Sequence, residues 1–161
     1  MLERIVFAVA LAASSVVLAQ EVDVLVAAPD DLSQANLGVL LAYSERHDPR
    51  YYAEDAVFYD MTLPEPIVGR EAIGAMFASI YAEGFPDADP QTTSLTAIGN
   101  RVIMEFVFRG TNTGTLFGRD ATGRFVEIPM MIVYDIDDGL IQEARLYYDG
   151  ASYARALGWS D

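Results

Sequence analysis

The sequence predicts an α+β fold in which a curved antiparallel β-sheet cups over helices from the N-terminal half of the chain. Apolar residues recur at helical spacing before Pro90 and alternate with period two after it. The chain has 161 residues and contains no internal repeat. Helices followed by an antiparallel meander form a two-layer domain, with the helices on one face of the sheet. We therefore expect a single domain over residues 20–161.

The first helix is expected between a start signal at Pro29-Asp30-Asp31 and a stop at His47-Asp48-Pro49. Its apolar face comprises Leu32, Ala35, Val39, Leu40 and Tyr43. His47 lies at the C-terminal end of this helix, where the helix dipole favours a cation. We expect it to be a helix-end residue rather than a catalyst.

The remaining elements follow from turn signals and from the period of the apolar residues. A short helical turn is expected near Arg50–Glu54, and the segment from Glu21 to Ala28 is left open as a strand or a linker. A second helix is expected from Arg70 to about Glu83, and a closing helical turn over Ser152–Leu157. Tight turns are expected at Gly99-Asn100 and Asp137-Asp138-Gly139. The predicted strands are Ala56–Asp60, Gln91–Ile98, Arg101–Arg109, Phe125–Ile136 and Leu140–Asp149.

The composition excludes several classes of function. There are 10 basic residues against 24 acidic ones, and the net charge is −14. Nucleic acids and anionic membranes require clustered positive charge, so neither is an expected partner. The chain has no cysteine and one histidine. We therefore expect no metal site, no thiolate nucleophile and no Ser-His-Asp triad.

The first 19 residues have the layout of a secretory signal peptide. Arg4 precedes an almost unbroken apolar run from Ile5 to Leu18, and Val17-Leu18-Ala19 offers small residues before Gln20. The run is about 14 residues long, and a membrane span takes about 20. We expect residues 1–19 to be a signal and the protein to be secreted or periplasmic. A buried or membrane-associated helix is the alternative.

A strongly curved sheet over helices leaves a conical apolar cavity, and strand alternation predicts which side chains point into it. Met76, on the apolar stripe of the second helix, is expected to face the same space. The inward strand residues are expected to be Phe58, Asp60, Met104, Phe106, Phe108, Met131, Val133, Ala144, Leu146 and Tyr148. An apolar stripe of this kind is also typical of packed core, so a filled cone stays open as an alternative.

Asp60 is the main candidate for chemistry. It ends a strand immediately before a turn that contains Pro64 and Pro66. A carboxylate there can reach the mouth of an apolar cavity and act as a general base. The alternative is that Asp60 only starts the turn, because aspartate side chains accept hydrogen bonds from nearby backbone N–H groups. Tyr43 and Tyr148 are the candidate hydrogen-bond donors.

Several segments resemble the SnoaL-like families of the nuclear transport factor two-like superfamily. They are YAEDAVFYD, VGREAIGAMF, FRGTNTG, TGRFVEIP and DDGLIQEARLYYDGASYARALG. The resemblance covers Leu32 to Gly158 and implies a conical, cystatin-like roll. The superfamily contains polyketide cyclases, ketosteroid isomerases, dehydratases, epoxide hydrolases and non-catalytic binding proteins, so the fold implies no single activity.

The resemblance also carries expectations for individual residues. SnoaL-like cyclases place a catalytic aspartate in a His-Trp-Asp run on the last strand. The matching positions here are Ala144, Arg145 and Leu146, so that acid–base pair is absent.

Ketosteroid isomerases use an aspartate at the end of the first strand as the base, and Asp60 matches it. Their oxyanion hole uses a protonated aspartate, matched by Met131, and a helix tyrosine. Leu40 matches that tyrosine, and Tyr43 lies one turn further on. Losing one such donor typically costs on the order of 100-fold in rate.

Two residues of the last strand are expected to be structural. Asp149 falls on the face opposite Tyr148, which favours a structural or interface role. Arg145 is expected to form a cross-strand ion pair with Glu143 or Glu105.

The favoured hypothesis is an enzyme that holds a hydrophobic carbonyl compound in the cone and moves a proton with Asp60, aided by Tyr43 or Tyr148. The expected lining residues are Phe58, Met76, Met104, Phe106, Phe108, Met131, Val133 and Leu146. We expect no cofactor, and we expect the protein to form a homodimer. The alternatives are an exported binding protein for a small apolar ligand, and a structural protein with a filled cone.

Overall fold

The computed structural model describes residues 23–26 and 30–159. The expected signal segment, residues 1–19, lies outside the described residues and stays a prediction. Within the described part, no helix is both long and apolar enough to cross a membrane. The elements in chain order are β1 (Asp23–Val26), α1 (Asp31–Ser44), η1 (Pro49–Tyr51), β2 (Tyr52–Asp60), β3 (Ile67–Val68), α2 (Arg70–Ala78), η2 (Ser79–Gly84), β4 (Gln91–Ile98), β5 (Arg101–Thr111), β6 (Phe125–Asp137), β7 (Leu140–Tyr148) and α3 (Gly150–Leu157).

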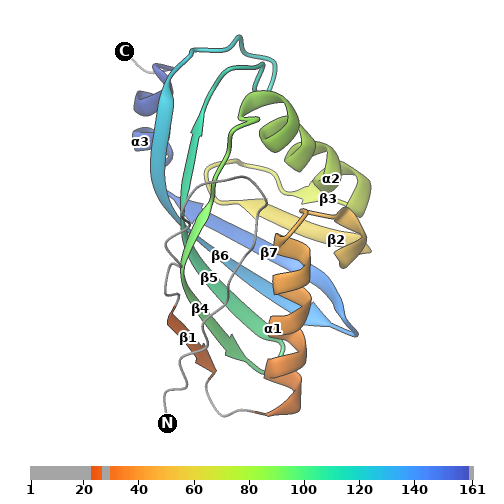
Figure 1. Cartoon of the computed structure of the whole chain (residues 1–161). Coiled ribbons are helices and arrows are strands. Elements are labelled where there is room, and N and C mark those ends of the chain that lie inside the picture. The colour runs from red at the N-terminus through yellow and green to blue at the C-terminus, as the bar shows by residue number, and fades with distance from the viewer. Residues whose placement is uncertain (1–22, 27–29, 160–161) are drawn as a thin grey trace.

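The described strands form one curved sheet in the order β1-β4-β5-β6-β7-β2-β3. In Figure 1, α1 and α2 lie to one side of this sheet, and α3 lies at the end remote from β1. The predicted α+β class is confirmed. Strands β4 to β7 form the antiparallel meander, whereas β1 pairs parallel with β4 and β2 pairs parallel with β7. The sheet is therefore mixed.

Most predicted elements appear close to their expected bounds. β4 and the turn at Gly99, where φ is 59°, agree with the sequence signals. β2 begins four residues earlier than expected, because η1 is a single turn that ends at Tyr51. The second helix continues beyond α2 as the π-helix η2. Glu21–Ala28, left open from the sequence, contains β1.

The predicted apolar face of α1 was partly wrong. Leu40 and Tyr43 are buried as expected, but Leu32 is 52% exposed. Ala35 is exposed too, and the buried side of the helix contains Ser33 and Asn36 instead. Hydrophobic spacing could not identify this side of the helix, because two of its five buried residues are Ser33 and Asn36.

Ser33 and Asn36 fasten α1 to the β4–β5 turn. The Gly99 N–H donates to Ser33 Oγ at 2.7 Å, and Asn36 Nδ2 donates to the Gly99 carbonyl oxygen at 3.1 Å. Both side chains are buried. Since buried polar groups are costly unless they are hydrogen-bonded, these contacts fix the position of the helix over the sheet.

We predict that Asn36→Leu lowers the free energy of unfolding by about 1–3 kcal/mol, because it leaves the Gly99 carbonyl without its buried donor. Urea unfolding followed by circular dichroism measures the change. The matched control is Gln34→Leu, on the exposed side of the same helix, which should change stability little. Equal effects of the two variants would contradict the assignment.

Candidate functional site

Asp60 lies at the end of β2, next to β7. The parallel register pairs Asp60 with Leu146, so its side chain is on the same sheet face as Leu146 and Tyr148. Oδ1 of Asp60 accepts hydrogen bonds from Thr62 N at 2.9 Å and from Thr62 Oγ1 at 2.7 Å. Oδ2 accepts one from the Tyr148 hydroxyl at 3.0 Å. Asp60 therefore both starts the turn and pairs with a catalytic candidate.

Tyr148 was expected on the inner face, but its contact with Asp60 was not predicted from the sequence. Its hydroxyl also lies 3.1 Å from Thr62 Oγ1, and its ring packs edge-on against Tyr153 with centroids 5.6 Å apart. Burial raises the pKa of Tyr148 to about 12, and the nearby Asp60 carboxylate adds to the rise. The phenol therefore stays protonated at neutral pH and acts as a hydrogen-bond donor.

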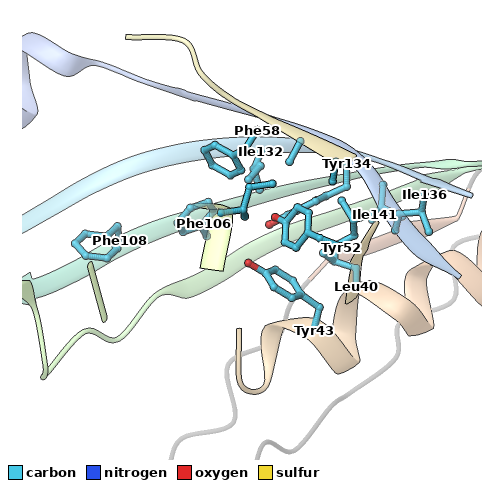
Figure 2. Close-up of a cluster of buried hydrophobic side chains, with 14 of the residues drawn as sticks. Leu40, Tyr43, Tyr52, Phe58, Phe106, Phe108, Ile132, Tyr134, Ile136 and Ile141 are labelled. Atoms are coloured by element: carbon cyan, nitrogen blue, oxygen red, sulfur yellow. The ribbon is translucent and has the colours of Figure 1, made fainter. Parts of the chain in front are cut away.

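Tyr43, the third catalytic candidate, is not part of this cluster. Its ring is buried against Tyr52, Phe77 and Tyr134. Figure 2 shows it reaching from α1 toward Tyr52 on the sheet. Burial, followed by the neighbouring phenols, raises the pKa of Tyr43 well above its ordinary value. The hydroxyls of Tyr43 and Tyr52 are close enough to affect each other's pKa, and neither bonds to a third group among the described residues.

The interior of the cone is largely occupied by aromatic rings. Phe77 packs within 6.5 Å, centroid to centroid, of Tyr43, His47, Tyr52, Phe58 and Tyr81. Phe58, Phe106 and Phe108 are buried in the core, as expected from strand alternation. Met76, Met104 and Leu146 are partly buried and pack against this core. Whether any of them contacts a substrate stays a prediction.

The predicted inward orientation of Met131 and Val133 was wrong. On β6 the buried residues are Ile132 and Tyr134, which pair with Met104 and Val102 of β5. Met131 and Val133 therefore point to the outer face of the sheet. The run Met130-Met131-Ile132-Val133-Tyr134 is apolar at every position, so alternation carried no information about its orientation.

Two hollows lie beside the Asp60–Tyr148 pair. One, of about 200 Å³, is lined by Tyr59 and Asp60 at the end of β2 and by Met61 and residues 63–66 of the β2–β3 connection. The other is an open depression of about 660 Å³, lined by residues of both sheet faces and including Tyr148. Its outer-face residues are Glu105, Val107, Pro129, Met131 and Tyr147. Asp60 thus lines the first hollow, and Tyr148 lines the second.

His47 is not the cation that the helix dipole favours. It stacks on Tyr81 with ring centroids 4.2 Å apart and on Phe77 at 5.7 Å, and it meets the edge of Tyr43. Burial lowers the pKa of His47 to about 4. Desolvation of the charged form outweighs the dipole here, so the imidazole is neutral at pH 7.

The two residues expected to be structural are so. Asp149 is the N-cap of α3 and accepts hydrogen bonds from the backbone N–H groups of Ala151 and Ser152. Arg145 forms an ion pair with Glu143, which is on its own strand, and its cross-strand partner is Asp135 of β6 rather than Glu105. Neither side chain approaches the Asp60 carboxylate within hydrogen-bonding distance.

Sequence reasoning missed Thr62 and Tyr153. A threonine two residues after a turn-starting aspartate is a recognisable side chain–backbone turn signal, so Thr62 could have been found from it. Tyr153 is on α3, and burial raises its pKa. In the described part of the chain, no group of three or more histidine, cysteine, aspartate or glutamate residues is arranged to hold a metal ion.

A family model for SnoaL-like polyketide cyclases matches residues 44–157. This chain belongs to the SnoaL-like polyketide cyclase family. The match includes the Asp60, Thr62 and Tyr148 cluster. Among curated proteins, none is similar enough in sequence to match.

Solved structures with the same fold agree with this assignment. A SnoaL-like protein from Jannaschia sp. CCS1 is 17% identical, with a TM-score of 0.75, over 84% of this chain and 99% of that one. A candidate polyketide cyclase from Xanthomonas campestris pv. campestris is 23% identical, with a TM-score of 0.64, over 79% and 99%. A phenazine biosynthesis-related protein from Pseudomonas aeruginosa is 18% identical, with a TM-score of 0.65, over 80% and 88%. At these identities the likeness shows the shared fold.

We predict that His47 makes this SnoaL-like protein less stable as the pH falls from 6.5 toward 4. In that window the unfolded chain binds a proton at His47 and the folded chain does not, which costs up to about 3 kcal/mol. His47→Phe keeps the stacking and removes the titration. As the pH falls, the free energy of unfolding of the wild type should therefore decrease more than that of the variant. Urea unfolding at several pH values measures both. Parallel pH profiles would contradict the prediction.

Proposed function

We propose that the protein is a SnoaL-like enzyme that moves a proton on a hydrophobic carbonyl compound, with Asp60 as the base and Tyr148 as the hydrogen-bond donor. The observation that carries the proposal is the 3.0 Å hydrogen bond from the Tyr148 hydroxyl to Asp60 Oδ2. It places a neutral phenol beside a carboxylate that lies on the wall of a hollow with apolar residues. Membership of the SnoaL-like family supports a small-molecule function.

The chemistry follows from the two groups. Oδ2 of Asp60 removes a proton from the carbon next to the carbonyl, the electron pair of the broken C–H bond forms a carbon–carbon double bond, and the π pair of the carbonyl moves onto its oxygen. The Tyr148 hydroxyl turns from Asp60 to that oxygen and stabilises the enolate that forms. The enolate then regains a proton at another carbon or attacks a second carbonyl group. These outcomes are the isomerase-like and cyclase-like versions of one mechanism.

A non-catalytic binding protein for a small apolar ligand is the second candidate. It is favoured by the aromatic interior, where the buried Tyr43 and Tyr52 hydroxyls bond to no third group among the described residues. A buried donor without an acceptor is costly, about 1–3 kcal/mol, and a ligand oxygen that accepted from these phenols would remove that cost. Export through the expected signal segment is compatible with either candidate.

The test of the enzyme is carbon-bound hydrogen exchange. Hydrophobic ketones and lactones are incubated in D₂O with the protein, and deuterium incorporation is followed by mass spectrometry. Asp60→Asn should lower the exchange rate on the order of 100-fold or more, since a positioned general base contributes about that much. The control Asp55→Asn changes an exposed carboxylate of the same strand and should leave the rate unchanged.

Three outcomes are informative. Exchange that is lost in Asp60→Asn and kept in Asp55→Asn supports the enzyme. Exchange unaffected by Asp60→Asn removes this residue from the mechanism. A compound that binds to the wild type without any exchange favours the binding protein.

We also propose that two copies associate through the outer face of the sheet. The support is the open depression over β5, β6 and β7, where Val107, Pro129, Met131 and Tyr147 present apolar surface. A carboxylate buried there without a partner is costly. Met131→Glu should therefore convert a dimer into a monomer in light scattering. Met61→Glu, which changes a methionine that is 53% exposed on the β2–β3 connection, should not. A monomeric wild type, or a dimeric Met131→Glu, would contradict the proposal.

A further inference from the structure

We propose that Thr62 is a positioning residue that holds Asp60 and Tyr148 in one fixed arrangement, and that Gly150 leaves the space that Thr62 requires. The inference rests on the proposed function, because Thr62 is assigned to the same pair. It goes further by naming the residue that decides which carboxylate oxygen is the base.

Thr62 donates two hydrogen bonds to one carboxylate oxygen of Asp60. Its backbone N–H and its hydroxyl both donate to Oδ1, at 2.9 Å and 2.7 Å. The carboxylate plane is therefore fixed from two directions by a single neighbour. Tyr148 donates to Oδ2 instead. Oδ1 is saturated by protein donors, so Oδ2 is the oxygen that takes up a proton from a substrate once the phenol turns away.

Thr62 also positions the phenol. Its Oγ1 lies 3.1 Å from the Tyr148 hydroxyl, so the three side chains form a closed ring of polar contacts. Each hydroxyl carries one proton, and both protons are donated to Asp60. Thr62 therefore acts on Tyr148 mainly through Asp60, because it fixes the carboxylate to which the phenol donates.

The absence of a side chain at Gly150 leaves room for Thr62 beside Asp60 and Tyr148. It is the first residue of α3, directly after the N-cap Asp149. A Cβ atom at position 150 would lie 2.9 Å from Thr62 Cγ2 and 3.3 Å from Thr62 Cβ. Both distances are shorter than normal carbon–carbon contact. An alanine would therefore push the Thr62 side chain away from Asp60 and Tyr148 without touching either of them.

The test uses three variants and two controls. Thr62→Val removes the hydroxyl and keeps the shape and the backbone N–H, Thr62→Ser restores the hydroxyl, and Gly150→Ala displaces Thr62. Thr115→Val changes an exposed threonine. Gly38→Ala changes a helical glycine whose added Cβ would meet nothing within 4 Å. Two readouts are taken: kcat and KM of ketone hydrogen exchange, and the NMR three-bond couplings that report the Asp60 side-chain rotamer.

We expect Thr62→Val and Gly150→Ala to lower kcat about tenfold with little change in KM, because a lost hydrogen bond to a charged group impairs orientation rather than binding. Thr62→Ser and both controls should stay within about twofold of the wild type. The Asp60 couplings should change from one rotamer to an average in Thr62→Val and Gly150→Ala, and in no other variant.

The opposite results overturn the inference. Unchanged couplings in Thr62→Val, or a loss of exchange that Thr62→Ser does not restore, would show that Thr62 does not position the pair. A rise in KM alone would make Thr62 a substrate contact. If the wild type catalyses no exchange, the proposed function fails, while the couplings still decide whether Thr62 fixes Asp60.

Discussion

The candidate site depends on the parallel pairing of β2 with β7. This pairing places Phe58 beside Ala144 and Asp60 beside Leu146, so that both strands end at the same edge. Asp60 then meets the Tyr148 hydroxyl at 3.0 Å, although the two residues are 88 positions apart in the chain. The helices before β2 and the hairpins before β7 bring these ends together. A shift of one residue in this register would turn Asp60 to the other face of the sheet.

The placement of polar groups follows from the cost of burying charge. The interior of the cone holds tyrosine hydroxyls and an imidazole, and burial moves their pKa values away from ionisation. These groups stay neutral at pH 7, so they avoid the penalty of a buried ion. The carboxylate of Asp60 lies at the rim instead, where it accepts three hydrogen bonds. A base at the rim can work on a substrate while the centre of the cone remains packed with aromatic rings.

Much of the fold could be predicted from the sequence, because many turns, strands and helix ends are determined by the residues within them. The turn at Gly99, the strand β4 and the start of α2 at Arg70 are examples. The buried side of α1 could not be predicted, because Ser33 and Asn36 are buried by hydrogen bonds to Gly99, which is 63 or more residues away in the chain. The orientation of β6 was also beyond the sequence, because residues 130–134 are apolar at every position. Only the register with β5 decides it.

In the candidate site, too, local features could be predicted from the sequence and long-range contacts could not. Asp60 could be named from a strand end and from family resemblance, and Tyr148 from strand alternation, but their contact is a product of the sheet order. The bond between Thr62 and Asp60 could have been predicted from local turn chemistry. The contact of Thr62 with Tyr148 and its dependence on Gly150 are tertiary contacts, which the local sequence does not indicate. Tyr43 was named on the same grounds as Tyr148, and packing places it among aromatic rings of the interior instead.

The central claim is that a carbonyl compound binds against the Asp60–Tyr148 pair. Its most direct test is an NMR titration of the isotope-labelled wild type with a hydrophobic ketone, with the shift changes mapped onto assigned residues. We expect saturating changes at Asp60, Thr62 and Tyr148 with one shared dissociation constant. Changes confined to Tyr43 and Tyr52, or to the outer-face residues Glu105, Met131 and Tyr147, would contradict it.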